Sequence, residues 1–246
     1  MIYLMLTDVN NKDIMKFNNL RRCVMAFISA FEVIGPNMVG PSSSHTAGAA
    51  SIARLAWKMT SKKIVSVKFT LYGSFAQTYR GHGTDRALLG GMMGFKTDDE
   101  RIRDSFEIAE KEGIDFSFVA NTVETDVHPN TVDMEIVDSN GHKLNVRGES
   151  IGGGKVRLTR IDGVKVLFTG EYHSLIVIHK DHPGVISKIT SVFGEYHVNI
   201  AYLRVYREAK GGKAYMIVES DEEITNEIVE KIEVNPFVKE TMLIRK

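Results

Sequence analysis

The chain has 246 residues, of which 43% are hydrophobic and 25% charged, and its 31 basic and 31 acidic residues give a net charge of zero. This composition predicts a soluble globular chain with enough apolar residues for one large domain or two small ones. Balanced charge without long runs of one sign argues against nucleic acid or an acidic membrane surface as the main partner. No apolar run is long enough to span a bilayer.

The first 24 residues differ from the rest of the chain. An apolar stretch at residues 2–6 precedes a polar middle and the basic pair Arg21-Arg22, which is the reverse of the order in a secretory signal. Met25 would serve as a natural start. We therefore expect residues 1–24 to be an unstructured N-terminal extension or the product of an over-called start codon.

A short apolar helix is expected at residues 27–34, and a loop rich in hydroxyl groups follows it. The loop reads Gly40-Pro41-Ser42-Ser43-Ser44-His45-Thr46-Ala47-Gly48. Apolar residues at 52, 55, 56 and 59 then predict a helix. The hydroxyls and the imidazole would lie at its N-terminus, where unpaired N–H groups favour a carboxylate or phosphate. One Ser or Thr suffices for a cap, so four hydroxyls and a histidine predict a functional site.

The rest of the first domain is expected to mix helices and strands. Alternating apolar residues predict strands at residues 65–71, 116–118 and 156–161, and a hairpin at 132–146 that turns at Asn140-Gly141. Thr84 is a plausible N-cap for a helix over 85–89 that Gly90-Gly91 ends. A further helix starts at 97–100 and stops at Gly113. The first domain is therefore predicted to be α+β and to span residues 25–169.

Residues 79–85 form a second polar cluster in this domain. Gly81 and Gly83 flank His82 and allow a ligand to approach the backbone closely, while Arg80 could pair with a carboxylate. Taken alone, the cluster is also typical of a turn followed by a helix cap.

The pattern restarts near Ser174 and predicts a second domain at residues 170–246. A short apolar strand, the turn Asp181-His182-Pro183-Gly184 and an amphipathic helix come first. Two strands joined at Gly211-Gly212, a second helix and a last strand follow. This order is β-α-β-β-α-β, a ferredoxin-like layout that by itself indicates no function.

The residues of the two polar clusters resemble those of a known family. The run Gly40 to Gly48, and the segment from Gly73-Ser74-Phe75-Ala76 through residues 81–91, are similar to the beta subunit of bacterial iron–sulfur-dependent L-serine dehydratases, the L-serine ammonia-lyases. The resemblance covers residues 27–246. It implies that both clusters meet at one site and that L-serine is converted to pyruvate and ammonia by β-elimination of water. It also implies a role in amino-acid degradation that feeds gluconeogenesis.

The resemblance implies two sets of site residues. The catalytic candidates are His45 and His82, which suit proton transfer. The candidates for substrate binding are Ser42, Ser43, Ser44, Thr46, Arg80, Thr84 and Asp85.

The chain has a single cysteine, Cys23, which excludes an intrachain disulfide and fits a cytoplasmic location. A 4Fe–4S cluster normally takes several thiolates, so this chain cannot hold one alone. The resemblance places the cluster on a separate alpha chain, with no metal bound by this one. An iron of that cluster would act as a Lewis acid on the serine hydroxyl.

The second domain resembles an ACT domain, a small regulatory module often tuned to amino acids. The pattern consists of Asp181, Pro183 and Gly184 together with Asn199-Ile200. The residues expected to take part in regulation are His182, Gly184, Asn199 and Ile200. Pairing of ACT domains between copies could also be purely structural.

A different class of function stays open. The first domain also resembles the allosteric substrate-binding domain of some phosphoglycerate dehydrogenases, which carry ACT domains too. The chain could then be a non-catalytic subunit that senses serine. Such a sensor needs the anion-binding helix end but not His45.

Two other groups of residues are weaker candidates for a functional site. His45, His82 and His128 could bind a mononuclear metal, but they lack the close spacing typical of such sites. The run Gly152-Gly153-Gly154-Lys155 lacks the spacing of a phosphate loop and is expected to be a flexible joint or bulge.

Overall fold

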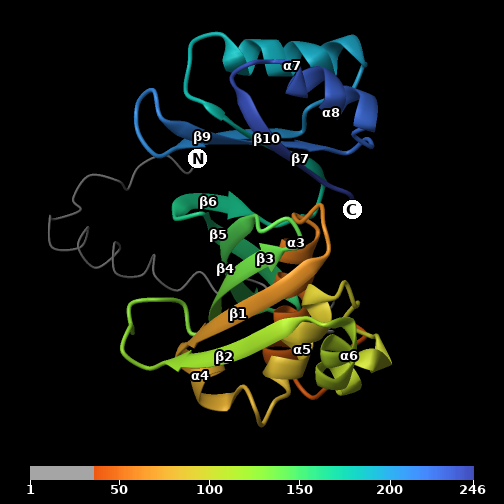
Figure 1. Cartoon of the computed structure of the whole chain (residues 1–246), viewed down its shortest axis with the longest axis vertical. Coiled ribbons are helices and arrows are strands. Elements are labelled where there is room, and N and C mark those ends of the chain that lie inside the picture. Colours follow the sequence, from red (N-terminus) through yellow and green to blue (C-terminus); the bar gives the residue numbers. More distant parts are fainter. Residues whose placement is uncertain (1–35) are drawn as a thin grey trace, which may run out of the picture. The chain divides into compact units, whose positions relative to one another are not determined.

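The computed structural model describes residues 36–246, and Figure 1 shows their course. The predicted extension 1–24, the predicted helix 27–34 and Cys23 lie outside the described residues. Within residues 36–246, no helix is long and apolar enough to cross a membrane.

The first domain is built on a six-stranded sheet with the order β2-β1-β3-β4-β5-β6. Strands β1 and β2 are parallel, and the other neighbours are antiparallel. The strands are β1 (Ile64–Tyr72), β2 (Asp115–Asn121), β3 (Thr131–Asp138), β4 (Lys143–Gly152), β5 (Lys155–Ile161) and β6 (Val164–Phe168).

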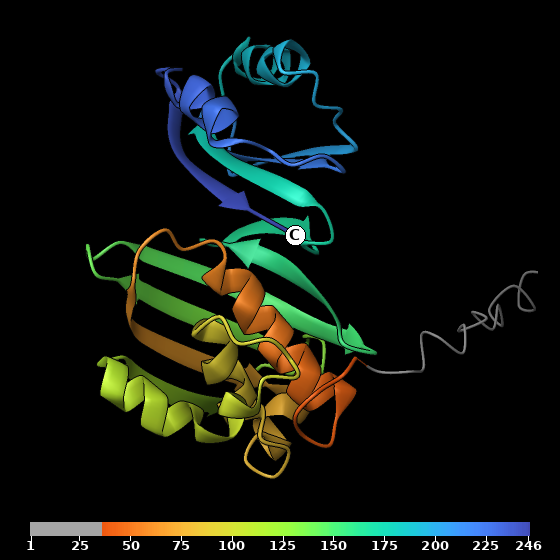
Figure 2. The same cartoon turned by 90° about the vertical axis from the view of Figure 1, so that its right-hand side faces the viewer.

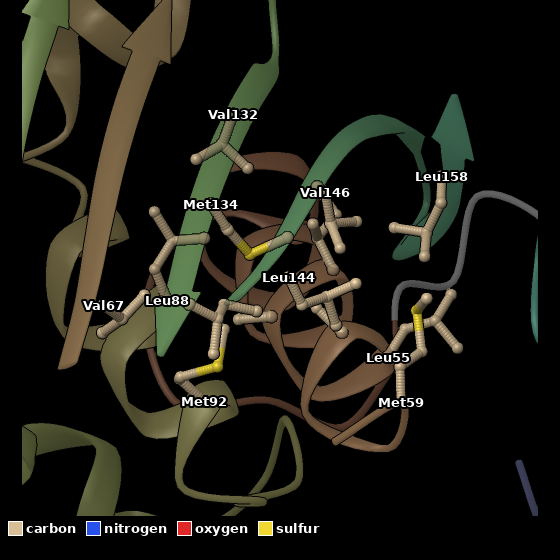
Figure 3. Packing of buried hydrophobic residues seen from close by; sticks show 14 of the residues in the cluster. Leu55, Met59, Val67, Leu88, Met92, Val132, Met134, Leu144, Val146 and Leu158 are labelled. Atoms are coloured by element: carbon tan, nitrogen blue, oxygen red, sulfur yellow. The ribbon is translucent and has the colours of Figure 1, made fainter. Parts of the chain in front are cut away.

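Helices α3 and α5 lie on one face of this sheet (Figure 2). The helical elements are a π-helical turn (Ser43–Ala47), α3 (Gly48–Trp57), α4 (Gly73–Thr78), α5 (Thr84–Met92), a 3₁₀ turn (Glu100–Asp104) and α6 (Ser105–Glu112). The core forms because alternate strand residues point towards the helices. Figure 3 shows side chains of α3 and α5 meeting those of β3 and β4, among them Leu55, Leu88, Met134 and Val146.

Two predicted helix boundaries are wrong. Helix α5 runs through Gly90-Gly91, and the residue before it is Gly83, with a φ of 65°, while Thr84 is its first residue. A Cβ on Gly91 would lie 2.3 Å from the carbonyl oxygen of Ala50 in α3. Packing between α3 and α5 therefore requires the glycine that a local pattern interprets as a helix end.

Two other predictions are refined. The helix expected from residue 97 begins as a 3₁₀ turn, capped by the Asp99 side chain, and Gly113 ends α6 with a φ of 72° as predicted. The run Gly152-Gly153-Gly154 is a tight turn between β4 and β5, and all three glycines have positive φ. The pairing of β4 with β5 shifts register between Ser150 and Gly152, so the predicted bulge is present beside this hairpin turn and the alternative of a flexible joint is not needed.

The second domain has the predicted β-α-β-β-α-β order. Its elements are β7 (His173–Lys180), α7 (Val185–Glu195), β8 (Tyr202–Arg207), β9 (Lys213–Ser220), α8 (Asn226–Glu233) and β10 (Val238–Ile244). The antiparallel sheet has the order β10-β7-β9-β8. Both helices pack over it around Leu175, Val177, Phe193 and Ile228. The predicted fold class, an α+β domain followed by a ferredoxin-like domain, is confirmed.

Candidate active site

The hydroxyl-rich loop enters helix α3 through a π-helical turn. Ser42 has extended backbone, and its Oγ accepts a hydrogen bond from the backbone N–H of His45 at 3.0 Å. Ser43 and Ser44 are half-buried, whereas Thr46 is buried. The loop therefore caps the helix with one hydroxyl and leaves the side chains of Ser43 and Ser44 for another role.

The imidazole of His45 contacts side chains from three other places in the chain. Its Nε2 lies 2.8 Å from Oγ of Ser74, and its Nδ1 lies 3.5 Å from Oγ of Ser42. The ring centroid is 5.4 Å from that of Phe75, in an edge-on arrangement, and 5.0 Å from that of His82. The two predicted histidines thus lie side by side although the sequence separates them widely.

Burial and charge both act on His45. Burial lowers the pKa of this histidine below its ordinary value of 6.5, and the positive charge that His82 can carry lowers the pKa further. The ring is therefore neutral at pH 7 and able to accept a proton.

A hydrogen bond joins the turn that carries His82 to the hydroxyl-rich loop before α3. The hydroxyl of Thr46 donates to the backbone carbonyl of His82 at 3.0 Å. His82 Nδ1 and the Thr84 hydroxyl are buried and have no hydrogen-bond partner within residues 36–246. Thr84 itself is fully buried. Unsatisfied buried polar atoms in a native protein call for an explanation, and function is one.

Arg80 in the turn before α5 and Asp85 in the first turn of α5 do not join the histidine pair. Arg80 is exposed, with its guanidinium over the ring of Tyr79. Asp85 accepts a hydrogen bond from the N–H of Arg86, and burial raises the pKa of its carboxyl. Among the described residues, neither forms a hydrogen bond or ion pair with His45 or His82.

Sequence reasoning missed several residues around this cluster. Ser74 belongs to a run that carried the family resemblance, but we expected no role for it. Ser150 Oγ would lie 2.1 Å from a Cβ on Gly48, so β4 fits closely against the start of α3. Asn130 Oδ1 and Ser150 Oγ are further buried atoms without a hydrogen-bond partner in the described part of the chain. No local pattern marks Asn130 or Ser150, because their positions depend on how β3 and β4 pair.

The three histidines weighed as ligands of a mononuclear metal, His45, His82 and His128, do not gather into one group in the described part of the chain. No group of three or more His, Cys, Asp or Glu side chains in 36–246 is placed to hold a metal ion. His128 accepts a hydrogen bond at Nδ1 from the N–H of Asn130, at 3.2 Å. This accounts for one nitrogen of the third histidine without a metal.

The residues predicted for regulation lie at two ends of the second domain. Gly184, with a φ of 85°, precedes α7, and His182 stacks on Phe237 with ring centroids 4.3 Å apart. The N–H of Asn199 donates to Glu222, just beyond the far end of β9. Within one copy the turn 181–184 and the pair Asn199-Ile200 are thus at opposite ends of the sheet, since Asp181 bonds to Gly212 before β9.

Comparison with known proteins agrees with this architecture. A family model described as "Serine dehydratase beta chain" matches residues 29–160, and one described as "ACT domain" matches residues 173–237. The chain belongs to the serine dehydratase beta chain family. It is 40% identical over 214 residues to a probable L-serine dehydratase beta chain of Bacillus subtilis, covering 87% of this chain and 96% of the relative.

Two further proteins to which this chain is similar are a second beta chain and a phosphoglycerate dehydrogenase. The L-serine dehydratase beta chain of Peptoniphilus asaccharolyticus is 42% identical over 204 residues, covering 83% of this chain and 92% of the relative. D-3-phosphoglycerate dehydrogenase of Archaeoglobus fulgidus is 30% identical over 172 residues, covering 69% of this chain but 32% of that enzyme. The predicted likeness to phosphoglycerate dehydrogenases is therefore real, and it is limited to part of those enzymes.

Proposed function

We propose that this chain is the beta chain of an L-serine dehydratase, a lyase that eliminates water from L-serine to give pyruvate and ammonia. The observation that carries the proposal is the pair His45 and His82, whose ring centroids lie 5.0 Å apart beside the starts of α3 and α5. Membership of the beta chain family supplies the substrate. The product would feed pyruvate metabolism and gluconeogenesis.

The elimination needs binding of the substrate carboxylate, removal of the Cα proton and help for the departing hydroxyl. The residues around His45 and His82 supply the first two. The substrate carboxylate would bind at the loop before α3, on the hydroxyls of residues 42–44 and on backbone N–H groups. Neutral His45, or His82 beside it, would take the proton from Cα. Arg80 in the turn that carries His82, and Thr84 and Asp85 at the start of α5, would support this half of the site.

The third requirement is help for the departing hydroxyl, and one cysteine is too few for this chain to hold an iron–sulfur cluster alone. A 4Fe–4S cluster would then be ligated by a separate alpha chain. When bound there, the cluster would supply Lewis-acid chemistry. The active enzyme would then be an assembly of both chains, and a cytoplasmic location suits a protein of this cysteine content.

The second domain would regulate or assemble the enzyme. We place the boundary between the domains at residues 169 and 170, after β6. Strand β8 is an edge of its sheet and exposes Tyr202, Leu203 and Val205. A second copy paired along this edge would bury those side chains. Such pairing would also allow the turn with His182 and Gly184 to approach Asn199-Ile200 of another copy.

The proposal is tested by anaerobic serine-to-pyruvate turnover with this chain alone, and with this chain plus a cluster-bearing alpha chain. We expect activity only in the mixture. His45→Gln should lower kcat by about 10²- to 10⁴-fold, as loss of a general base does. As the pH increases and the His45 ring loses its proton, kcat/KM should rise. Because burial lowers the pKa of His45, the midpoint of this rise should lie below pH 6.5.

The control is Lys62→Gln, an exposed change after α3. An intact two-chain complex with a loaded cluster but no turnover would instead favour the serine sensor. Full turnover in His45→Gln would refute the catalytic assignment of that residue.

A further inference from the structure

The hydroxyl of Ser74 forms the shortest side-chain contact of the histidine pair. Its Oγ lies 2.8 Å from Nε2 of His45, and within residues 36–246 this hydroxyl makes no other hydrogen bond. The two residues are 29 positions apart in the sequence. A contact of this length is a hydrogen bond of ordinary strength, in which one of the two atoms supplies the proton.

The backbone around Ser74 is held from two sides. Gly73, with a φ of 50°, lies so close to Pro129 that a Cβ would come within 2.8 Å of its backbone atoms. The N–H of Phe75 donates to the Pro129 carbonyl, and the hydroxyl of Thr78 donates to the Ser74 carbonyl at 2.7 Å. The position of Ser74 is therefore set by the backbone and does not depend on its contact with His45.

The second ring nitrogen has a weaker neighbour. Oγ of Ser42 already accepts the backbone N–H of His45, so the hydrogen of this hydroxyl is available to a nearby acceptor. The Nδ1 atom of the ring lies 3.5 Å from this hydroxyl. A neutral imidazole has one N–H and one lone pair. With the lone pair on Nδ1 and the N–H on Nε2, the ring accepts the Ser42 hydrogen and donates to a lone pair of Ser74 Oγ, so both ring nitrogens have a partner.

We propose that Ser74 is a positioning residue: its Oγ accepts the Nε2–H of His45 and leaves Nδ1 as the basic nitrogen of the ring. The inference about the tautomer of His45 does not depend on any catalytic role of the ring. The further statement that Nδ1 takes the substrate proton rests on the proposed function. Substrate would then reach His45 on the Ser42 side, where the hydroxyl loop begins, and not on the Ser74 side.

The tautomer can be measured on this chain without a partner. The chain is labelled with ¹⁵N-histidine and observed by two-bond proton–nitrogen correlation. At about pH 8 the imidazole rings are neutral, and the spectrum reports which ring nitrogen carries the hydrogen. The His45 signals are those that disappear in His45→Gln. We expect Nε2 to be protonated in the natural chain. Ser74→Ala should change the tautomer ratio by about fivefold, the effect of losing one hydrogen bond.

Three further variants separate this role from a general disturbance of α4. Ser74→Thr keeps the hydroxyl and should keep the tautomer. Thr78→Val removes the hydroxyl that bonds to the Ser74 carbonyl and should also keep it. If Ser74→Ala does not fold, Ser74→Cys replaces it, since a thiol is a much weaker acceptor. An Nδ1–H tautomer in the natural chain, or an unchanged ratio in the variant lacking the hydroxyl, overturns the inference.

Turnover with a cluster-bearing alpha chain distinguishes this inference from the proposed function. Loss of the Nε2–H tautomer in Ser74→Ala should lower kcat and change the pH profile of kcat/KM, while Ser74→Thr restores both. If the tautomer depends on Ser74 but His45→Gln is fully active, the catalytic proposal fails and the positioning role stands. If the tautomer is independent of Ser74, the positioning role fails whatever the turnover.

Discussion

At the scale of single residues, His45 shows how surroundings set the chemistry of a side chain. Burial is the larger cause and the neighbouring His82 the smaller one, and both lower the pKa of the ring. Since the unfolded chain takes up a proton at higher pH than the folded chain, the contribution of His45 to stability is present above pH 6.5. It is lost as the pH falls through that value towards the lower folded-state pKa. The site therefore favours a base over a cation.

Arg147 shows the opposite case, a charge that is retained because it is paired. Only 8% of this residue is exposed. Its guanidinium donates to both carboxylate oxygens of Asp133, at 2.6 and 2.7 Å, and to the hydroxyl of Tyr72. The hydrogen bonds to Asp133 raise the pKa of Arg147. This bidentate ion pair joins β3 and β4 on the face of the sheet away from the helices.

We predict that Asp133→Asn destabilises the fold by about 2 kcal/mol, measured by urea unfolding. The cost is below that of a fully buried pair, because the Asp133 side chain is 30% exposed. The matched control is Glu135→Gln on the same strand, whose pair with Lys68 is exposed on both sides. It should cost less than about 1 kcal/mol. Equal effects of the two changes would contradict the special role of the Arg147 pair.

At the scale of elements, the contact between α3 and α5 positions the site. Helix α3 starts at the hydroxyl loop, and α5 starts at the His82 turn. Their close approach depends on Gly91, which faces Ala50 and Ala53. Because both helices begin beside the site, a change in their spacing would alter the distance between His45 and His82.

Gly91→Ala is predicted to destabilise the chain by about 1–2 kcal/mol, since overpacking outweighs the better helix propensity of alanine. The control is Gly194→Ala in α7, where a Cβ would meet nothing within 4 Å. That change should stabilise by up to about 1 kcal/mol. Thermal unfolding of both variants gives the comparison, and stabilisation by both would show that the helices separate without cost.

At the scale of the whole molecule, the second domain leaves an apolar edge uncovered. Tyr202, Leu203 and Val205 of β8 are between 38% and 46% exposed. Exposed apolar edge strands favour pairing with another strand. The proposed assembly through the ACT domain is therefore expected to use this edge.

Leu203→Glu should reduce the size of the assembly in light scattering. The reason is that each of the two paired copies would then carry a negative charge on the edge strand at the interface. Ile186→Glu is the matched control, since Ile186 on α7 is 41% exposed and Leu203 is 40% exposed. It should leave the size unchanged. If Leu203→Glu assembles like the unchanged chain, the edge is not the interface.

The sequence alone determined most of the elements, because alternation and helical periodicity are local patterns. The strands β1 to β5 and the β-α-β-β-α-β order were predicted correctly, as was the helix end at Gly113. The two motifs also predicted the family, since they are runs of neighbouring residues. Local rules failed at Gly90-Gly91, where packing between helices overrides the tendency of glycine to end a helix.

Only the tertiary structure decided how the site is assembled. The contact of His45 with Ser74 joins residues 29 positions apart, and its existence depends on where α4 lies against Pro129. The lowered pKa of His45 likewise depends on burial and on His82. Such properties come from distances across the fold, and no pattern of neighbouring residues contains those distances.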